Sequence, residues 1–296
     1  MISVLIPVYN YQVFNLVESI HTQLLLLKIE FEIICVDDAS IEYVDENKII
    51  EKFNNTFIFS LKNNVGRSKI RNLLVEKSIY NWLLFLDADV LPQNNNFLIN
   101  YIHFIKINSH KVYFGGIVYE NNKPNKDKLL RWVYGKEREE INLNIREQNP
   151  YQYFLGANFL INKSVFTSIK FNESIVKYGY EDVLFVDDLR RSYIEVKQIN
   201  NAVFHLGVEE NSKFLSKTKE AIQNLIYLNS EKIVDWKSIK ILRTYEKIKL
   251  YRLTWVFSLI YIVFNKILEW NLKSKSPSMQ IFDVYKLTYL CYISRK

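Results

Sequence analysis

Two carboxylates follow an apolar segment in the first third of the chain. Residues 82–86 read Trp-Leu-Leu-Phe-Leu, and Asp87, Ala88 and Asp89 come directly after them. Such continuous apolar character predicts a strand that is buried on both faces of a parallel sheet. Alternate residues of an extended segment point the same way, so Asp87 and Asp89 can face one ligand. Carboxylate oxygens suit Mg²⁺ or Mn²⁺, although this tripeptide alone could equally be a solvated turn.

Two earlier segments place further polar residues at strand ends. Residues 3–8 predict a first strand, which Pro7 is expected to end because proline cannot donate to a central ladder. Residues 31–36 predict a second buried strand after a helix over about 13–27, and Asp37 and Asp38 follow that strand. Open α/β sheets bind ligands beyond the carboxyl ends of their strands. The sequence therefore predicts that several carboxylates meet at one edge of a sheet.

The segment between these acids adds hydrogen-bond donors. Residues 56–61 predict a short strand, and the turn after it contains Gly66 and Arg67 before a helix that carries Arg71. Glycine lets the backbone approach a ligand closely, and a guanidinium offers planar donors to a base carbonyl or a phosphate. The order strand, helix, strand, strand, helix, strand predicts a doubly wound α/β layer.

These motifs, taken in order, resemble the nucleotide-sugar-binding half of family 2 glycosyltransferases of the GT-A fold. The resemblance rests on residues 6–10, 36–40, 64–67 with 71–72, and 86–89. It implies that Asp37 and Asp38 read a uracil ring with help from Arg67 or Arg71. It also implies that Asp87 touches the ribose and that Asp89 holds the Mn²⁺ or Mg²⁺ that bridges the donor diphosphate. The other members of the implied donor site are Pro7, Tyr9, Asn64, Gly66 and Ala88.

Residues 156–163 and 179–185 resemble the acceptor half of such enzymes and of related galactosyltransferases, which carry an acidic pair there. The resemblance implies that Asp182 is the base that takes the acceptor hydroxyl proton, and that Glu181 orients an acceptor hydroxyl or supports the site. His205 stands where the family often has a third metal ligand. Two plainer interpretations remain open: the acidic pair can cap a helix over 183–189, and a lone histidine on an apolar strand is more often structural.

We expect an α/β protein with a GT-A (Rossmann-like) mixed or parallel sheet, flanking helices and a C-terminal helical extension. The expected divisions are 1–110 for donor binding, 111–210 for acceptor binding and catalysis, and 211–296 for the extension. The length of 296 residues, with 49% hydrophobic and 15% aromatic content, excludes a disordered chain. A helix from Leu129 carries Trp132 and Tyr134, which either stack on a sugar ring or simply pack.

Positive charge is concentrated in the last segment. Residues 232–296 hold 13 Lys and Arg against 4 Asp and Glu, whereas the rest of the chain holds 26 against 28. Residues 253–264 are uncharged and begin near Trp255, and Trp270 follows a short polar break. Such a run is short for a membrane span but suits the headgroup region of an anionic leaflet. The alternative is a helical pair that packs on the catalytic domain or forms a dimer.

The resemblance implies an inverting, metal-dependent glycosyltransferase. It also implies transfer of a sugar from a UDP-sugar donor to a hydroxyl of a glycan or lipid-linked oligosaccharide acceptor, in cell-surface polysaccharide synthesis. Two cysteines and an N-terminal strand in place of an export signal favour the cytoplasm, with peripheral attachment to the membrane through 232–296. The alternative function is a non-catalytic membrane- or nucleic-acid-binding protein on an inactive GT-A scaffold, although no nucleic-acid partner is expected.

Overall fold

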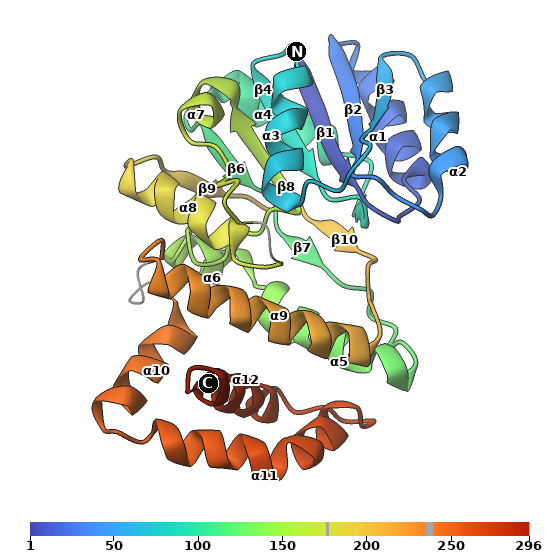
Figure 1. Cartoon of the computed structure of the whole chain (residues 1–296). Coiled ribbons are helices and arrows are strands. Elements are labelled where there is room, and N and C mark those ends of the chain that lie inside the picture. The colour runs from blue at the N-terminus through green and yellow to red at the C-terminus, as the bar shows by residue number, and fades with distance from the viewer. Residues whose placement is uncertain (176–177, 235–238, 296) are drawn as a thin grey trace. The chain divides into compact units, whose positions relative to one another are not determined.

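The computed structural model describes residues 1–175, 178–234 and 239–295, and these form two compact units (Figure 1). The first unit comprises Met1–Glu120, Arg138–Val176 and Glu181–Gly207, and the second comprises Asn121–Glu137, Lys177–Tyr180 and Val208–Lys296. Every residue of the implied donor and acceptor sites belongs to the first unit. The separation of a donor half from an acceptor half stays a prediction.

A seven-stranded mixed sheet forms the centre of the first unit, in the order β3-β2-β1-β4-β8-β6-β9. The first four strands along the chain run parallel, while β8 runs antiparallel to both of its neighbours. This confirms the predicted α/β class with a mixed sheet. The strands are β1 (Ile2–Val8), β2 (Phe31–Asp37), β3 (Thr56–Ser60), β4 (Trp82–Leu86), β6 (Val112–Phe114), β8 (Asn158–Asn162) and β9 (Val196–Gln198). A small second sheet pairs β5 (Val90–Pro92), β10 (Val203–His205) and β7 (Ile117–Val118).

Strand β1 extends one residue past Pro7, contrary to the prediction that proline ends it. Val8 faces β2, since its carbonyl accepts the N–H of Asp38 at 2.9 Å, and so the nitrogen of Pro7 points to the β4 side. Pairing between β1 and β4 has already stopped at Leu5. The missing N–H of Pro7 therefore leaves no ladder hydrogen bond unmade, and the strand continues.

Helices cover both faces of the large sheet. On one face α3, α7 and α8 close a core with β1, β2, β4 and β8, and on the other α1 packs against α4 and β2 (Figure 1). The helices of this unit are α1 (Phe14–Leu27), α2 (Val44–Lys48), α3 (Arg67–Lys77), α4 (Phe97–Ile107), α6 (Leu143–Gln148), α7 (Lys163–Ser168) and α8 (Glu181–Arg191), with a short 3-10 turn η1 (Ile49–Lys52). Strands that are buried on both faces explain why their sequences lack polar alternation.

Stacked phenylalanines hold α8 against the sheet. Phe185 of α8 packs against Phe159 of β8 with ring centroids 6.0 Å apart and stacks on Phe171 at 4.3 Å. Phe85 of β4 stacks on the same Phe159 at 4.6 Å. All four rings are buried. Since the acidic pair forms the first turn of α8, this aromatic contact positions the two carboxylates.

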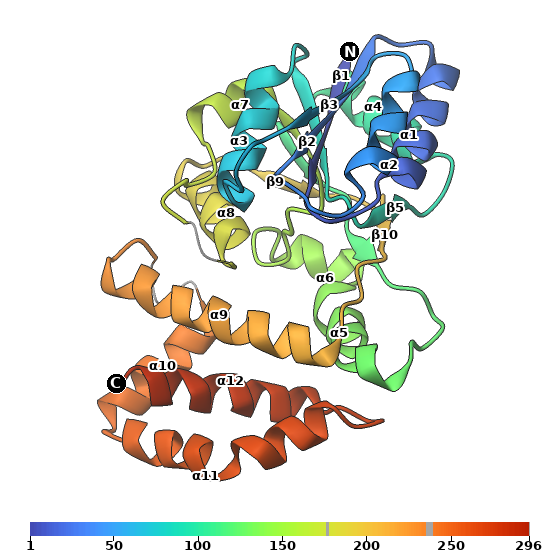
Figure 2. The ribbon, with the colours of Figure 1, turned by 45° about the vertical axis from the view of Figure 1, so that its right-hand side comes forward.

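The second unit is helical. It contains η2 (Lys126–Lys128), α5 (Leu129–Tyr134), α9 (Asn211–Ser230), α10 (Lys240–Leu250), α11 (Thr254–Leu272) and α12 (Met279–Ile293), and the π-helical turn η3 (Gly135–Glu139) leads back to the first unit. Within it α12 lies between α9 and α11 (Figure 2). The predicted C-terminal helical extension is thus confirmed, whereas residues 235–238 and 296 of the basic segment lie outside the described residues.

The apolar stretch of the extension continues through Asn265 and Lys266 as one helix, α11. Over the described ranges, no single helix is long and apolar enough to cross a membrane. The pair α10 and α11 meets that standard only as two helices bent by 115°.

Replacing Phe185 by alanine should destabilise the first unit by about 3–5 kcal/mol, because it removes a fully buried ring and leaves a cavity beneath α8. Urea unfolding measures the effect, with Phe57→Ala as the control, since Phe57 of β3 is 46% exposed. Equal losses in the two variants would mean that the aromatic contact does not hold α8.

Candidate functional site

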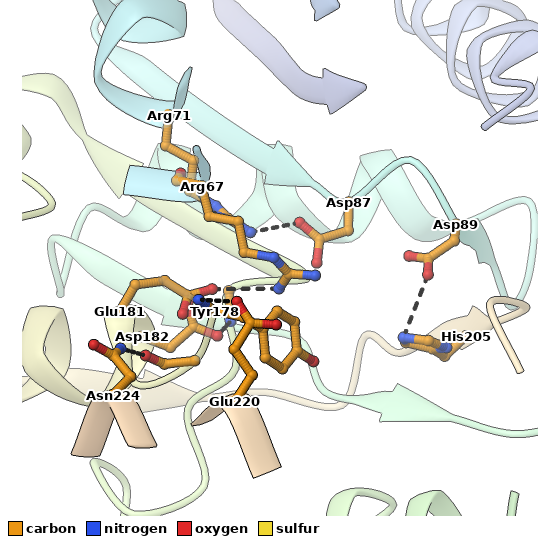
Figure 3. Close-up of polar contacts among 12 residues, drawn as sticks. Arg67, Arg71, Asp87, Asp89, Tyr178, Glu181, Asp182, His205, Glu220 and Asn224 are labelled. Atoms are coloured by element: carbon orange, nitrogen blue, oxygen red, sulfur yellow. Dashed lines mark hydrogen bonds and ion pairs between the residues drawn. The ribbon is translucent and has the colours of Figure 1, made fainter. Parts of the chain in front are cut away.

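A buried ion pair joins α3 to the end of β4. Arg71 Nη2 lies 2.7 Å from Asp87 Oδ1, and the arginine side chain is only 3% exposed (Figure 3). Arg71 also donates to the carbonyl of Arg67 at 3.2 Å and lies over the Phe171 ring. Burial raises the pKa of Asp87, and the nearby guanidinium opposes that rise. The pair thus holds the Asp87 carboxylate at the strand end where the sequence predicts a ribose contact.

Arg67 connects the same helix to the acidic pair of α8. Its Nη1 lies 3.3 Å from Glu181 Oε1, and the Glu181 side chain is buried while Arg67 is half-exposed (Figure 3). Burial raises the pKa of Glu181, but Arg67 and Arg71 together outweigh it and leave that pKa below its usual value. Glu181 therefore remains charged and orders Arg67 at the mouth of the site.

Asp182 has one carboxylate oxygen bound and one without a partner among the described residues. Its Oδ2 accepts the backbone N–H of Gly156 at 3.0 Å, and its Oδ1 is buried without a hydrogen bond. Burial, with the charge of Glu181, raises the pKa of Asp182 to about 6, although Arg71 and the Gly156 N–H oppose this. A carboxylate with a raised pKa and an unoccupied oxygen is equipped to take a proton.

Gly156 leaves the space that the Asp182 carboxylate occupies. A Cβ there would lie 2.6 Å from Asp182 Oδ1, so a larger residue would push the carboxylate away. The acids also begin α8, as the helix-capping interpretation predicts, so the structural role and the chemical role are compatible.

Asp38 holds the turn before α3. Its Oδ1 accepts the N–H of Val65 at 2.6 Å and its Oδ2 accepts that of Gly66 at 3.1 Å, while Asn64 donates to the Asp38 carbonyl. Burial raises the pKa of Asp38, and the two backbone donors oppose it. The carboxylate thus fixes the loop that carries Arg67, and each oxygen keeps a lone pair for a base N–H.

The neighbouring Asp37 is buried and accepts the N–H of Ser40 at 2.9 Å. At the start of the same edge, Pro7 lies within β1 and Tyr9 is 55% exposed. The Tyr9 ring is therefore available to a ligand, whereas Asp37 acts on the 37–40 turn.

Asp89 and His205 face each other from two adjoining strand ends. Asp89 Oδ2 lies 3.7 Å from His205 Nε2 (Figure 3), and the Asp89 carbonyl accepts the N–H of Leu206 at 2.8 Å. His205 stacks on Tyr119 at 5.3 Å, and its Nδ1 is buried without a partner in the described part of the chain. Neither the hydrogen bond from Leu206 nor the stacking on Tyr119 uses Asp89 Oδ2 or His205 Nε2.

Gly207 makes room for that carboxylate. A Cβ on Gly207 would lie 1.9 Å from Asp89 Oδ2, so only glycine allows the carboxylate its place. At 3.7 Å, Asp89 Oδ2 and His205 Nε2 make no hydrogen bond to each other, and together they fit a divalent cation whose remaining ligands come from phosphate. Across residues 1–175, 178–234 and 239–295, no group of three or more His, Cys, Asp or Glu could hold a metal by itself. A cation would therefore depend on the substrate for most of its ligands.

A cavity of about 330 Å³ opens beside this pair. Its lining includes Tyr11 and Tyr43, Ala88 from the Asp-Ala-Asp segment, and Leu206. Burial raises the pKa of Tyr11, and the charge of Asp89 contributes, which places the phenol near that carboxylate. The sequence interpretation named Ala88 but missed Tyr11.

Gly156, Gly207 and Tyr11 are the residues of this candidate site to which sequence reasoning assigned no role. Gly156 begins the segment 156–163 that carries the resemblance, Tyr11 directly follows the segment 6–10, and Gly207 lies two residues after His205. Tyr134, by contrast, packs on Phe214 and Phe282 within the helical unit, as the packing alternative predicts.

Sheet, strand-end carboxylates and flanking helices together define a GT-A type of α/β protein. Residues 3–169 match the family described as glycosyl transferase family 2, and the chain belongs to that family. An uncharacterised glycosyltransferase of Rickettsia felis is 30% identical over 138 residues, which is 40% of this chain and 23% of the relative. The minor teichoic acid biosynthesis protein GgaB of Bacillus subtilis is 26% identical over 297 residues, 95% of this chain and 30% of the relative. The chain spans at most 30% of the length of these curated relatives.

Solved structures are similar over nearly the whole chain. A mannosyltransferase from Pyrobaculum calidifontis, in complex with GDP-Man and Mn²⁺, superposes with a TM-score of 0.60 at 10% identity, covering 99% of this chain and 86% of its own. S. aureus TarS 1–349 superposes with a TM-score of 0.54 at 17% identity, covering 100% and 92%. At these identities the likeness shows the fold alone.

Replacing Gly207 by alanine should weaken Mn²⁺-dependent nucleotide binding by about tenfold or more, because the new methyl group would displace the Asp89 carboxylate. Calorimetric titration with and without MnCl₂ measures this, and Asn200→Ala, an exposed neighbour, serves as the control. Unchanged binding in the glycine variant would show that Asp89 does not hold the cation.

Replacing Asp182 by asparagine should stabilise the protein above pH 6 and leave it unchanged below pH 4. A carboxyl with a raised folded-state pKa stabilises the fold below its unfolded pKa, and this contribution is lost as pH rises through about 6. The wild type should therefore lose up to about 3 kcal/mol over that interval, which the amide avoids. Thermal unfolding from pH 4 to 8 tests this, with the exposed Asp127→Asn as control; parallel curves for Asp182→Asn and wild type would contradict it.

Proposed function

We propose that this protein is an inverting, metal-dependent glycosyltransferase that moves a sugar from a UDP-sugar to a hydroxyl of a glycan acceptor. The observation that carries the proposal is Asp182, whose unpartnered Oδ1 and raised pKa suit a general base. Family membership supports sugar transfer as the reaction class.

In the proposed reaction Asp182 removes the acceptor hydroxyl proton while the acceptor oxygen bonds to the anomeric carbon. The bond from that carbon to the diphosphate breaks, and the diphosphate leaves with the electron pair. Attack from the face opposite the leaving group inverts the anomeric configuration. No second carboxylate is assigned as a nucleophile, so the proposal contains one displacement.

The arginines and the buried acids are proposed to bind the donor and to orient the acceptor. Arg67 is half-exposed on α3 and paired with Glu181, and in this proposal it turns toward a phosphate of the donor. Arg71 stays buried and holds Asp87 for the ribose. Asp37, Asp38 and the exposed Tyr9 ring are proposed to receive the uracil. Glu181 keeps Arg67 oriented and can accept an acceptor hydroxyl.

Asp89 and His205 are the residues that would hold Mn²⁺ or Mg²⁺. Bound there, the cation would neutralise charge that develops on the departing diphosphate. Support for a metal comes from the open Asp89 oxygen that Gly207 permits and from the mannosyltransferase, which was solved with Mn²⁺.

Donor and acceptor classes draw their support from the relatives. TarS was solved in complexes with UDP and with UDP-GlcNAc, and GgaB is named for minor teichoic acid biosynthesis. We therefore favour a UDP-sugar donor and a hydroxyl-rich cell-surface polymer, or its lipid-linked precursor, as acceptor. Peripheral attachment at the cytoplasmic face of the membrane through 232–296 belongs to the same proposal.

The competing function is a non-catalytic scaffold that binds a membrane or nucleic acid. Binding of UDP-sugars in a calorimeter, with and without Mn²⁺, separates the two. We expect metal-dependent binding of one UDP-sugar that Asp89→Ala abolishes, whereas absence of any nucleotide binding would favour the scaffold.

Asp182→Asn should retain donor binding but lower kcat by about 10²–10⁴-fold, because the amide cannot take the proton. In the wild type kcat should rise with pH through about 6, where Asp182 loses its proton. Glu181→Gln is the matched variant, which should retain more activity. An unchanged kcat in Asp182→Asn would exclude this residue as the base.

A further inference from the structure

Helix α11 presents one apolar face that no other described element covers. The face consists of residues that repeat at intervals of three and four: Trp255, Leu259, Ile262, Val263, Ile267 and Trp270. Each is between 50% and 74% exposed. At about 100° per residue these positions fall on an arc of roughly 140°. We call this arc the α11 outer face.

The opposite side of α11 is held by specific contacts, so the helix cannot turn to bury the outer face. Tyr261 packs on Tyr289 of α12 with ring centroids 5.2 Å apart. Glu269 accepts a hydrogen bond from the Tyr285 hydroxyl at 2.8 Å and lies 3.1 Å from the ammonium of Lys219. These contacts join α11 to α12 and α9, the two helices that lie to one side of it in Figure 2. These contacts therefore keep the outer face exposed within the helical unit.

The exposed charges of α11 and of the segments that flank it in the chain have one sign. Between Lys240 and Ser278, every charged residue that is exposed is a lysine or an arginine. The two acids of that range, Glu246 and Glu269, are partly buried and paired with Lys249 and Lys219. The exposed cations are Lys240, Arg243, Lys247, Lys249, Arg252, Lys266, Lys273 and Lys275.

We infer that the α11 outer face docks on an anionic lipid bilayer, with the helix in the plane of the interface. Apolar side chains would enter the acyl boundary, while Trp255 and Trp270 would lie at the headgroup level near each end. Lys266, the one charge within the arc, has a stem long enough to reach the headgroups. The inference deepens the proposed function and rests on it, because it names the surface on which a membrane-bound acceptor would be met.

Charge complementarity selects this occupant over a second copy of the chain. Two outer faces in contact would bring two sets of exposed cations together without an exposed acid to balance them, whereas anionic lipids attract each one. The packed inner side also opposes a spanning arrangement, since Glu269 and Lys219 would lose their partners in lipid.

Sedimentation of the whole chain with vesicles tests the inference, using phosphatidylcholine alone and with about 30% phosphatidylglycerol. Binding should be at least about tenfold stronger on the anionic vesicles and should weaken with salt. Ile262→Glu should lower it by about tenfold or more, because a carboxylate would enter the apolar face. Lys249→Gln should lower it about fivefold on anionic vesicles only.

Leu26→Glu is the control, since Leu26 is 77% exposed on α1 of the other unit. Absence of binding to both vesicles, or equal effects of Leu26→Glu and Ile262→Glu, would overturn the inference. A wild-type dimer that Ile262→Glu converts to a monomer in sedimentation velocity would also overturn it and assign the face to self-association. UDP-sugar binding by the same variants shows separately whether the proposed catalytic function survives.

Discussion

Buried charge at the carboxyl edge of the large sheet is the constraint on which the site depends. Asp87, Glu181 and Asp182 come from two different elements and lie in a partly dry environment, where like charges repel strongly. The two arginines of α3 compensate them, Arg71 at Asp87 and Arg67 at Glu181. Removing either cation would leave a buried anion unpaired, which is among the costly changes a fold can suffer.

The balance is incomplete, and the uncompensated carboxylate is the one that we propose as the base. Arg71 and Arg67 satisfy Asp87 and Glu181, while Asp182 receives one backbone hydrogen bond and keeps an oxygen without a partner. Its pKa therefore rises to about 6, close to the range in which a base works at neutral pH. Ionised Asp182 therefore lowers the stability of the fold, but it provides a group that can accept a proton.

Small residues and backbone donors adjust this edge as much as charged side chains do. Gly156 and Gly207 leave the space that the carboxylates of Asp182 and Asp89 occupy. Asp38 fixes the turn that begins α3 and so sets the position of Arg67. In the helical unit, paired polar groups on the inner side of α11 fix the helix and so keep its apolar side exposed.

By itself the sequence determined the α/β class, the strands that lead to Asp37 and Asp87, the acidic start of α8 and the helical extension. These follow from local pattern, since apolar runs, breaks and charge depend on neighbours along the chain. The extra residue of β1 beyond Pro7 was decided by its neighbours in the sheet, because Val8 pairs with β2 while pairing with β4 has stopped at Leu5, and no local pattern reports this. Only the tertiary structure decided that Arg67 meets Glu181, that Gly207 admits Asp89 and that α11 leaves one face uncovered. The first two are contacts between residues that are distant in the chain, and the third depends on which elements do not pack against α11. All three are set by the packing of whole elements.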